Sequence, residues 1–297
     1  MNADSVKARL KNLAKEDGGT MQDKLIAYAL ERSIYRLSVS NYANRFTLKG
    51  GIFLYALFDK QFTRATLDID LLAQSLANDE AIIKGVFQEV FSIEYDDALR
   101  YDLDSLEVRR ITEFKEYHGV NVSINTYLDK TEIPVSIDIG FGDVIYPDRI
   151  QMSFPVLLNM AEPKIYAYSI YSVIAEKFEA FVSMGLVNSR YKDFYDIYIL
   201  ATSFDLFGHE LKRAIQETFS HRETGFDDIV AFENDFVNDP TRQNRWKAFI
   251  KKKKAMEDIS FQSALSTIKD VLFPIVESIN INSEYNKKWL CKEKRWE

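Results

Sequence analysis

Apolar residues change their spacing along the chain, and the changes divide it into predicted regions. Over the first forty residues they recur every three or four positions, which predicts two helices separated by a turn at Gly18 and Gly19. From about Phe46 to Pro147 the spacing shortens to alternation, which predicts strands of one sheet. The predicted strands span residues 67–72, 106–111, 120–128 and 135–139, and helices are predicted at 51–58 and 79–91.

Beyond Ala161 the strand patterns nearly vanish and helical spacing returns. The predicted helices span residues 170–184, 192–201, 210–219, 240–251 and 260–279. Asp239 and Pro240 mark the start of the fourth, as N-cap and first helical residue. The pattern predicts an α+β fold, with N-terminal helices and a sheet lobe over residues 1–160 and a helical C-terminal lobe over 161–297. We expect the last dozen residues to form a tail.

Composition places the chain among ordinary globular proteins. With 297 residues, of which 46% are hydrophobic, it is long enough to bury its own core as two lobes or one large domain. Its start, from Met1 to Asp4, lacks the regions of a secretory signal, and no apolar run approaches the roughly 20 residues that span a bilayer. We therefore expect a cytoplasmic protein that does not partner with a membrane.

Cysteine and histidine usage directs the search for metal ligands to carboxylates. The single cysteine, Cys291, excludes an internal disulfide framework and a cysteine-based zinc site. The three histidines lie far apart in the sequence and give little support to a histidine metal site or a serine–histidine triad.

The net charge of −7 argues against broad adhesion to nucleic acid, although a local basic surface can exist within an acidic total. The best candidate is the run from Lys251 to Lys254, which follows Arg245 and Lys247. Such a run is ordinarily a solvated helix face.

The stretch from Arg64 to Leu72 carries the most informative pattern. In a strand, Asp68 and Asp70 point to one face and their apolar neighbours to the other. Adjacent carboxylates repel each other, and a hard divalent cation between them removes that cost. Alternating aspartates also occur on solvated strand faces, so the pair alone is a weak signal.

The predicted strand around Asp138 repeats this arrangement and brings a third carboxylate to the same rim. Three carboxylates suit metal ions that clamp the attacking and leaving oxygens of a phosphoryl displacement. Asp138 is then a metal ligand, a general base, or both.

Upstream, Lys49, Gly50 and Gly51 precede a predicted helix. A glycine pair at a helix start lets backbone N–H groups approach a phosphate, although a plain tight turn explains the pair equally well. Arg64 offers a planar fork for phosphate oxygens and Lys49 a point charge, so both are candidate phosphate partners. Thr66 is a candidate for ordering the turn.

These residues together resemble motif I of the AbiEii/AbiGii toxin family, in which the lysine–glycine–glycine segment precedes an arginine–x–threonine–x–aspartate–x–aspartate segment. The resemblance begins in the predicted helices at residues 28–46. It continues through 137–143 and 175–177 to about 196, roughly two-thirds of the chain. Members of this family are nucleotidyltransferase-like toxins of type IV toxin–antitoxin and abortive-infection systems.

The resemblance implies a nucleotidyltransferase fold, with a small mixed sheet flanked by helices and a helical C-terminal lobe that closes over a nucleotide cleft. It implies magnesium-dependent transfer of a nucleoside monophosphate, from GTP or a pyrimidine nucleoside triphosphate, with release of pyrophosphate. The implied acceptor is tRNA or a protein, and the implied partner is a cognate antitoxin from a neighbouring gene.

Lys177 lies within the apolar stripe of its predicted helix. Its side chain either runs along the core to reach water or presents a cation to the triphosphate. The resemblance favours the second role, in which Lys177 neutralises charge on the leaving pyrophosphate.

The following predicted helix has Ser189 as its N-cap, and Asp193 and Asp196 share one of its faces. Asp193 near the N-terminus also suits the helix dipole. The resemblance implies that both aspartates belong to the active site, where either one orients Lys177 or Arg190.

Asp143, which follows Gly142, is either a loop cap or a further site residue. Two other functions remain open. One is a nucleotide-binding regulator with an inactive site, and the other is a metal-dependent phosphohydrolase, which paired carboxylates also serve.

Overall fold

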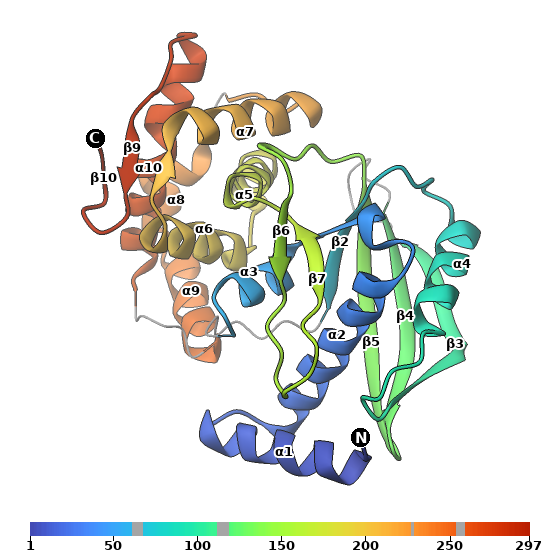
Figure 1. Ribbon diagram of the computed structural model, residues 1–297. Coiled ribbons are helices and arrows are strands. Elements are labelled where there is room, and N and C mark those ends of the chain that lie inside the picture. The colour runs from blue at the N-terminus through green and yellow to red at the C-terminus, as the bar shows by residue number, and fades with distance from the viewer. Residues whose placement is uncertain (61–67, 112–118, 227–228, 254–258) are drawn as a thin grey trace. The chain divides into compact units, whose positions relative to one another are not determined.

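The computed structural model describes residues 1–60, 68–111, 119–226, 229–253 and 259–297 (Figure 1). It divides into two compact units, each described by itself. Unit 1 comprises Met1–Gly142 and Ile150–Ala167, and unit 2 comprises Asp143–Arg149 and Tyr168–Glu297.

Unit 1 combines helices with one mixed sheet. Its helices are α1 (Ala3–Glu16), α2 (Met21–Val39), the 3₁₀ turn η1 (Ala43–Arg45), α3 (Gly50–Leu57) and α4 (Glu80–Phe91). Its strands are β1 (Phe46–Lys49), β2 (Ile69–Ala73), β3 (Leu99–Ile111), β4 (Gly119–Leu128), β5 (Thr131–Phe141), β6 (Ile150–Ser153) and β7 (Lys164–Ala167). Among the described residues the strand order is β3-β4-β5-β2-β1-β7-β6. The β2–β5 and β1–β7 pairs are parallel and the remaining pairs antiparallel.

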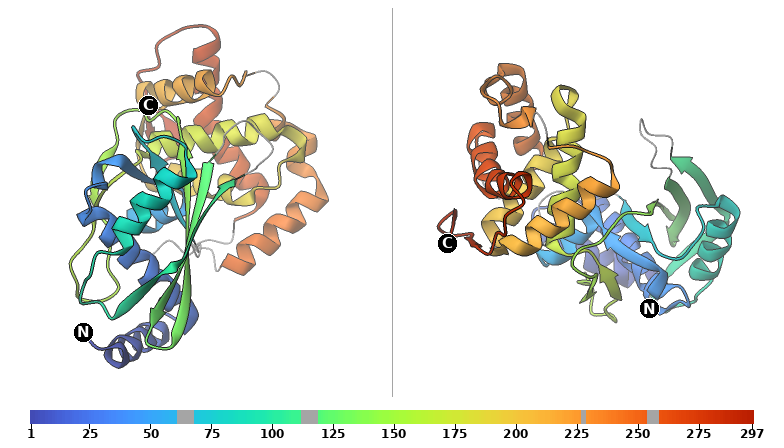
Figure 2. Two further views of the ribbon diagram at one scale, coloured as in Figure 1. Left: turned by 90° about the vertical axis from the view of Figure 1, so that its right-hand side faces the viewer. Right: turned by 90° about the horizontal axis from the view of Figure 1, so that it is seen from above.

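One face of the sheet is buried beneath helices. On β4 and β5, apolar side chains such as Val122 and Ile137 are buried, and they alternate with half-buried or exposed polar residues. Helix α2 packs against β5 and α4 against β3, and the two helices contact each other on the same side of these strands (Figures 1 and 2). The polar residues of β4 and β5 therefore line the opposite face.

Unit 2 is mainly helical. Its helices are α5 (Ile170–Met184), η2 (Gly185–Val187), α6 (Tyr191–Ser203), α7 (Gly208–His221), η3 (Val230–Phe232), α8 (Asn234–Asn238), α9 (Pro240–Lys253) and α10 (Phe261–Asn280). Helix α5 packs against α6 and α7, and α10 packs against α6, α7 and α9. Aromatic side chains fill the interior, where the Phe194 and Phe261 rings meet edge to face at 5.7 Å.

The α+β fold class predicted from the sequence is confirmed. The predicted alternation corresponds to β2, β3, β4 and β5, and the helical spacing to α1 through α7, α9 and α10. Asp239 caps α9 as predicted, because its Oδ1 accepts a hydrogen bond from the Arg242 N–H at 2.8 Å. Ser189 as N-cap of α6 was wrong, since Arg190 is the N-cap and the helix begins at Tyr191.

The expected C-terminal tail was also wrong. Strands β8 (Leu206–Phe207), β9 (Lys288–Leu290) and β10 (Arg295–Trp296) form a small sheet. Trp289 on β9 is fully buried, and its Nε1 donates to the main-chain oxygen of Ala201 at the end of α6. One buried indole is enough to dock a segment whose other residues are mostly polar.

Candidate functional site

Three carboxylates converge in unit 1 because of how two strands pair. Strands β2 and β5 are parallel neighbours, and Asp70 is the direct register partner of Asp138. Their flanking residues, Ile69 and Ile137 among them, are buried on the helix-covered face. The two aspartates therefore share the opposite face.

Asp68 completes the group from the residue just before β2. One carboxylate oxygen from each of Asp68, Asp70 and Asp138 lies within 4.8 Å of the other two, and all three side chains are half-buried. This is an all-oxygen set of donors held on two adjacent strands. Such a set suits a hard divalent cation such as Mg²⁺.

The turn from β1 into α3 packs directly on Asp70. Gly50 has φ +64°, and a Cβ added to it would lie 1.9 Å from Asp70 Oδ2, so no other residue fits here. The Gly51 N–H donates to the same oxygen at 3.3 Å, and Lys49 is the register partner of Asp70 across β1 and β2. The glycine pair thus makes a close approach to the carboxylate as well as a turn.

Asn121 on β4 holds Asp138 in place, although the sequence analysis did not single it out. Its Nδ2 donates to Asp138 Oδ1 at 2.7 Å and to Ser136 Oγ at 2.8 Å. It is also the register partner of Asp138 in the antiparallel β4–β5 pair. The available signal was a polar amide among the alternating residues of β4, but the pairing register does not follow from that pattern.

A metal ion fits the donor chemistry of this face. The three carboxylates repel one another unless a cation or a proton intervenes. The Asp70 carboxylate occupies the space that a Cβ at Gly50 would need. Asp68, Asp70 and Asp138 would hold the ion, while Asn121 orients Asp138 from behind.

A second cluster lies within unit 2. Lys177 on α5 contacts two carboxylates of α6, with its Nζ 2.7 Å from Asp193 Oδ1 and 2.8 Å from Asp196 Oδ2. Arg190 reaches the other Asp193 oxygen, Oδ2, at 2.7 Å. The Lys177 side chain is 12% exposed, and those of Asp193 and Asp196 are at most 2% exposed.

Burial and charge act against each other at Asp193. Burial by itself would raise the pKa of Asp193, but the adjacent Lys177 and Arg190 hold that pKa below its usual range. Asp193 therefore stays ionised, and it fixes the position of the Lys177 ammonium group. The predicted face shared by Asp193 and Asp196 points at α5, and α5 supplies the cation.

Asp143 belongs to a different ion-pair cluster of unit 2. It accepts from Arg222 Nη2 at 2.9 Å, while Arg222 Nη1 donates to Glu179 at 2.8 Å. Burial would lower the pKa of Arg222, but Glu176 and Asp143 raise that pKa above its ordinary value. Asp143 therefore forms an ion pair with Arg222, and whether it is a loop cap or a further site residue stays a prediction.

The predicted site residues thus fall into two described groups and one undescribed pair. Unit 1 brings together Asp68, Asp70, Asp138, Lys49, Gly50 and Gly51. Unit 2 brings together Lys177, Asp193, Asp196 and Arg190. Arg64 and Thr66 lie outside the described residues.

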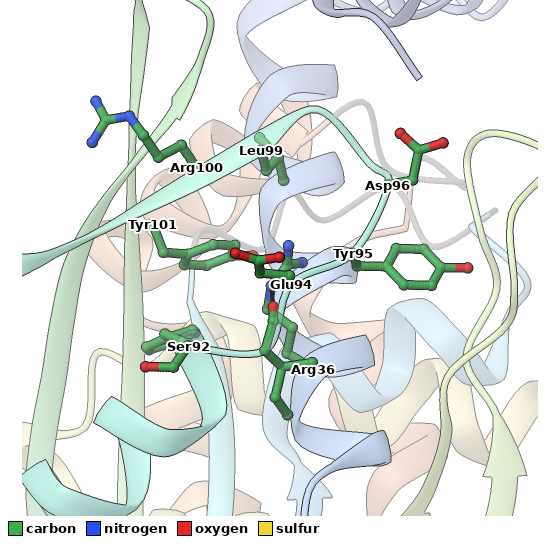
Figure 3. Close-up of a pocket in the computed structure, with 10 residues that line it drawn as sticks. Arg36, Ser92, Glu94, Tyr95, Asp96, Leu99, Arg100 and Tyr101 are labelled. Carbon is green, nitrogen blue, oxygen red and sulfur yellow. Dashed lines mark hydrogen bonds between the residues drawn. The ribbon is translucent and has the colours of Figure 1, made fainter.

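Unit 1 also contains a cavity of about 560 Å³ that shares no residue with the carboxylate group. Arg36 and Tyr101 line it (Figure 3), with the guanidinium carbon 4.4 Å from the centre of the tyrosine ring. Arg36 also forms two hydrogen bonds to the buried Asp97, at 2.6 and 3.1 Å. Its donors already serve the fold, so this cavity is a weaker candidate for the chemistry.

A parallel strand pair that carries converging carboxylates, beside a glycine turn that opens a helix, offers oxygen ligands for a cation and backbone N–H groups for a phosphate. Residues 32–267 match the profile of the family described as nucleotidyl transferase AbiEii toxin of type IV toxin–antitoxin systems. The chain belongs to this family, which confirms the resemblance seen in the sequence.

Two solved structures from Helicobacter pylori are similar to this chain. One is provisionally assigned as a nucleotidyltransferase, with a TM-score of 0.45 and 14% identity over 86% of this chain and 96% of that chain. The other, JHP933, has a TM-score of 0.47 and 14% identity over 89% of this chain and 95% of that chain. No curated protein matches significantly. None of the described helices is both long and apolar enough to span a membrane.

Proposed function

We propose that the protein is a magnesium-dependent nucleotidyltransferase that transfers a nucleoside monophosphate from a nucleoside triphosphate to an acceptor. The observation that carries this proposal is the convergence of Asp68, Asp70 and Asp138 to within 4.8 Å on adjacent parallel strands. When bound, Mg²⁺ supplies electrophilic stabilisation of phosphate oxygens at the reacting phosphorus.

The side chains and backbone groups of unit 1 have separate roles in the proposed reaction. Asp138, oriented by Asn121, is placed to accept the proton of an acceptor hydroxyl as well as to bind metal. Asp70 is fixed by the Gly51 N–H. Lys49, at the end of β1, provides a positive charge for the phosphates. Gly50, Gly51, Arg64 and Thr66 complete the proposed nucleotide-binding residues of unit 1.

The second cluster serves the same reaction in this proposal. Lys177 is the cation that neutralises charge on the leaving pyrophosphate, and Asp193 and Asp196 position its ammonium group. Arg190, whose side chain is 42% exposed, is an additional nucleotide-binding group. Support comes from the buried, paired geometry of the cluster and from the family resemblance of its motif.

The biological setting follows from family membership. Type IV toxin–antitoxin systems pair a toxin with an antitoxin, so we propose a cognate antitoxin encoded by a neighbouring gene and action in the cytoplasm. The proposed donor is GTP or a pyrimidine nucleoside triphosphate. The proposed acceptor is tRNA, with a protein acceptor as the alternative that the labelling experiment distinguishes.

The test is transfer of label from each of the four α-³²P nucleoside triphosphates, with Mg²⁺, to total RNA and to cell protein. Wild-type protein is expected to label one acceptor class, whereas Asp68→Ala labels none. Equal labelling by the variant would overturn the proposal. Release of phosphate without a labelled acceptor would identify a phosphohydrolase instead, and nucleotide binding without turnover would identify a regulator.

The toxin role has a separate test in growing cells. Induction of the wild-type chain is expected to arrest growth, and co-expression of the neighbouring gene is expected to restore it. Induction of Asp68→Ala is expected to have no effect. Normal growth on induction of the wild-type chain would contradict the toxin role and leave the transferase chemistry to be judged by the labelling assay.

A further inference from the structure

The carboxylates of unit 1 belong to a row of side chains that crosses neighbouring strands. The strand order around the site is β3-β4-β5-β2-β1 (Figure 1). Register partners on neighbouring strands point to the same face of a sheet. Each residue of the row is the register partner of the next, and from β1 to β3 the row reads Lys49, Asp70, Asp138, Asn121 and Arg109. The row therefore has a cation at each end, with two carboxylates and an amide between them.

Arg109 lies on the carboxylate face at the β3 end of the row. Its register partner is Asn121 of the site, whereas the next residue along β3, Arg110, is the register partner of the buried Val120. Arg110 accordingly points to the helix-covered face, where its Nε lies 3.1 Å from a carboxylate oxygen of Glu80 on α4. Of these two adjacent arginines, Arg109 shares the face of the site and Arg110 does not.

The described contact of Arg109 leaves its guanidinium able to bind a ligand. Arg109 pairs with Glu107 of the same strand, with Nη2 2.6 Å from Oε2, and the two side chains are 75% and 54% exposed. An ion pair this exposed contributes little to stability, so an oxyanion of a ligand can replace the glutamate at little cost. The planar fork of an arginine can bind two oxygens of one phosphate. Arg109 therefore offers an anion-binding group that the fold does not need.

The direction of the proposed reaction decides which substrate reaches Arg109. In a phosphoryl displacement the attacking and leaving oxygens lie in line, on opposite sides of the phosphorus. Lys49 and the glycine turn into α3 lie on the Asp70 side of the row, and the proposed function assigns them to the triphosphate. The attacking hydroxyl then comes from the Asp138 side, where β4 and β3 continue the row. Arg109 accordingly faces the acceptor and not the donor.

The spacing of the strands fits a phosphate beside the reacting hydroxyl. Neighbouring strands lie about 4.8 Å apart, so the Cα atoms of Arg109 and Asp138, which are two strands apart, are separated by about 10 Å. This separation leaves room for the hydroxyl at the Asp138 carboxylate and for a neighbouring group at the guanidinium. The two residues can therefore contact adjacent groups of one acceptor.

The charge of this face also calls for a cation on the acceptor side. The face carries the three site carboxylates and Glu107. These negative charges repel an acceptor that bears a phosphate, unless a positive group lies beside that phosphate. On β3, Arg109 is the cation in register with the site.

We propose that Arg109 is a specificity-determining residue of the transferase and binds a phosphate that flanks the acceptor hydroxyl. In the proposed transfer the acceptor oxygen bonds to the α-phosphorus, the bond to pyrophosphate breaks, and the hydroxyl proton passes to Asp138. Arg109 takes no part in these bonds and holds the acceptor in line for them. The inference rests on the proposed function and deepens it, because it names the side chain that selects the acceptor.

The experiment measures steady-state label transfer by the full chain, with Mg²⁺ and the α-³²P nucleoside triphosphate that the wild type uses. Total RNA is the acceptor, and KM is determined separately for RNA and for the triphosphate. The test variant is Arg109→Ala. The matched control is Arg110→Ala, because Arg110 is the adjacent arginine, is also exposed and paired with one glutamate, and lies on the opposite face.

Arg109→Ala is expected to raise the KM for RNA about 10-fold, through loss of a charge-assisted contact, while kcat and the KM for the triphosphate change less than about 2-fold. Arg110→Ala should leave all three values within about 2-fold of wild type. Arg109→Lys should recover part of the affinity, because lysine keeps the charge but lacks the fork. The midpoint of urea unfolding should be unchanged in every variant, which separates a binding role from a structural one.

A second arm removes the charge of the phosphate instead of the arginine. A synthetic RNA whose last linkage is an uncharged methylphosphonate is compared with the same RNA carrying a normal phosphodiester. The wild type is expected to lose about 10-fold in kcat/KM on the uncharged RNA, whereas Arg109→Ala should lose less than about 2-fold. Equal losses in the two proteins would show that another group binds this phosphate and would overturn the inference.

Two further results would overturn the inference while the transferase stands. One is a KM for RNA that Arg109→Ala leaves unchanged or that Arg110→Ala raises equally, and the other is labelling of protein without labelling of RNA. Absence of labelling of any acceptor by the wild type would overturn the proposed function and, with it, this inference.

Discussion

In unit 1, Asp68, Asp70 and Asp138 lie half-buried on one face of β2 and β5, whereas in unit 2 Asp193 and Asp196 are buried against Lys177. In the first group, Asp70 accepts from the Gly51 backbone N–H and Asp138 accepts from the Asn121 amide. The second group is neutralised by cations of the protein itself. The two groups therefore differ in burial and in arrangement: three oxygens converge on one another in the first, whereas each carboxylate of the second faces a cation.

The largest effect on activity is expected when a carboxylate of the unit 1 group is neutralised. Asp70→Asn should lower the transfer rate by about 10³-fold, because it removes a metal ligand, while the midpoint of urea unfolding stays nearly unchanged. Rate is measured by label transfer and stability by urea titration. Asp104→Asn, an exposed aspartate of the same unit, is the control and should retain activity. A stable Asp70→Asn variant with wild-type activity would show that the unit 1 carboxylate group is not needed for transfer.

Removal of the Lys177 ammonium group from the second group is expected to lower the stability of the protein. Lys177→Met leaves two buried carboxylates without their shared partner and should lower the free energy of unfolding by about 3 kcal/mol. Lys192→Met, exposed on the same helix α6 as the aspartates, is the control and should change it little.

The double variant Lys177→Met/Asp193→Asn separates stability from chemistry. It should regain part of the lost stability, because one uncompensated charge is gone, yet remain inactive if Lys177 serves the triphosphate. Recovery of activity together with stability would show that the cluster has a structural role alone.

A smaller effect is expected from the residue behind Asp138. Asn121→Ala removes the 2.7 Å hydrogen bond to Asp138 and should lower activity or metal affinity by about 10- to 100-fold. A titration with Mg²⁺ measures this as a higher half-saturating concentration. Asn121→Asp places a fourth carboxylate there and should not restore the wild-type curve. Wild-type metal dependence in Asn121→Ala would show that Asp138 is held without it.

The smallest expected effect is on how the stability of the protein depends on pH. The folded-state pKa of Asp193 lies below its unfolded value, so the ionised pair stabilises the protein above about pH 4 and is lost as pH falls through the folded-state pKa. Asp193→Asn should be less stable at pH 7, and its stability should fall less steeply below about pH 4, by up to about 1.4 kcal/mol per pH unit. Urea titrations at pH 3 to 7 measure both curves. If the stabilities of the wild type and Asp193→Asn fell equally steeply below about pH 4, the lowered pKa of Asp193 would be contradicted.

The sequence predicted the carboxylate face well because alternation is a local property. Asp68 and Asp70 alternate with apolar residues, and so does Asp138, so their common orientation needed no long-range information. The alternation around Asp138 placed it at the same rim, but its direct pairing with Asp70 was not predicted, because neither strand alone determines which residues pair.

The misses have physical reasons as well. Strands β1, β6 and β7 are four residues long, too short to display a period. Asn121 was missed because its significance depends on the β4–β5 register. At α6, Ser189 has the residue type of an N-cap, but the side chain of the preceding Asn188 accepts the Arg190 N–H and moves the helix start onward by one residue.

Gly50 has a consequence for how such a toxin can be silenced. At this position the backbone and Asp70 occupy the volume that any side chain would need. A single methyl group, as in Gly50→Ala, is therefore expected to displace the Asp70 carboxylate without removing any ionisable group from the chain. The result would be a disarmed protein with an unchanged charge pattern, suited to trapping the antitoxin or the acceptor in living cells without killing them.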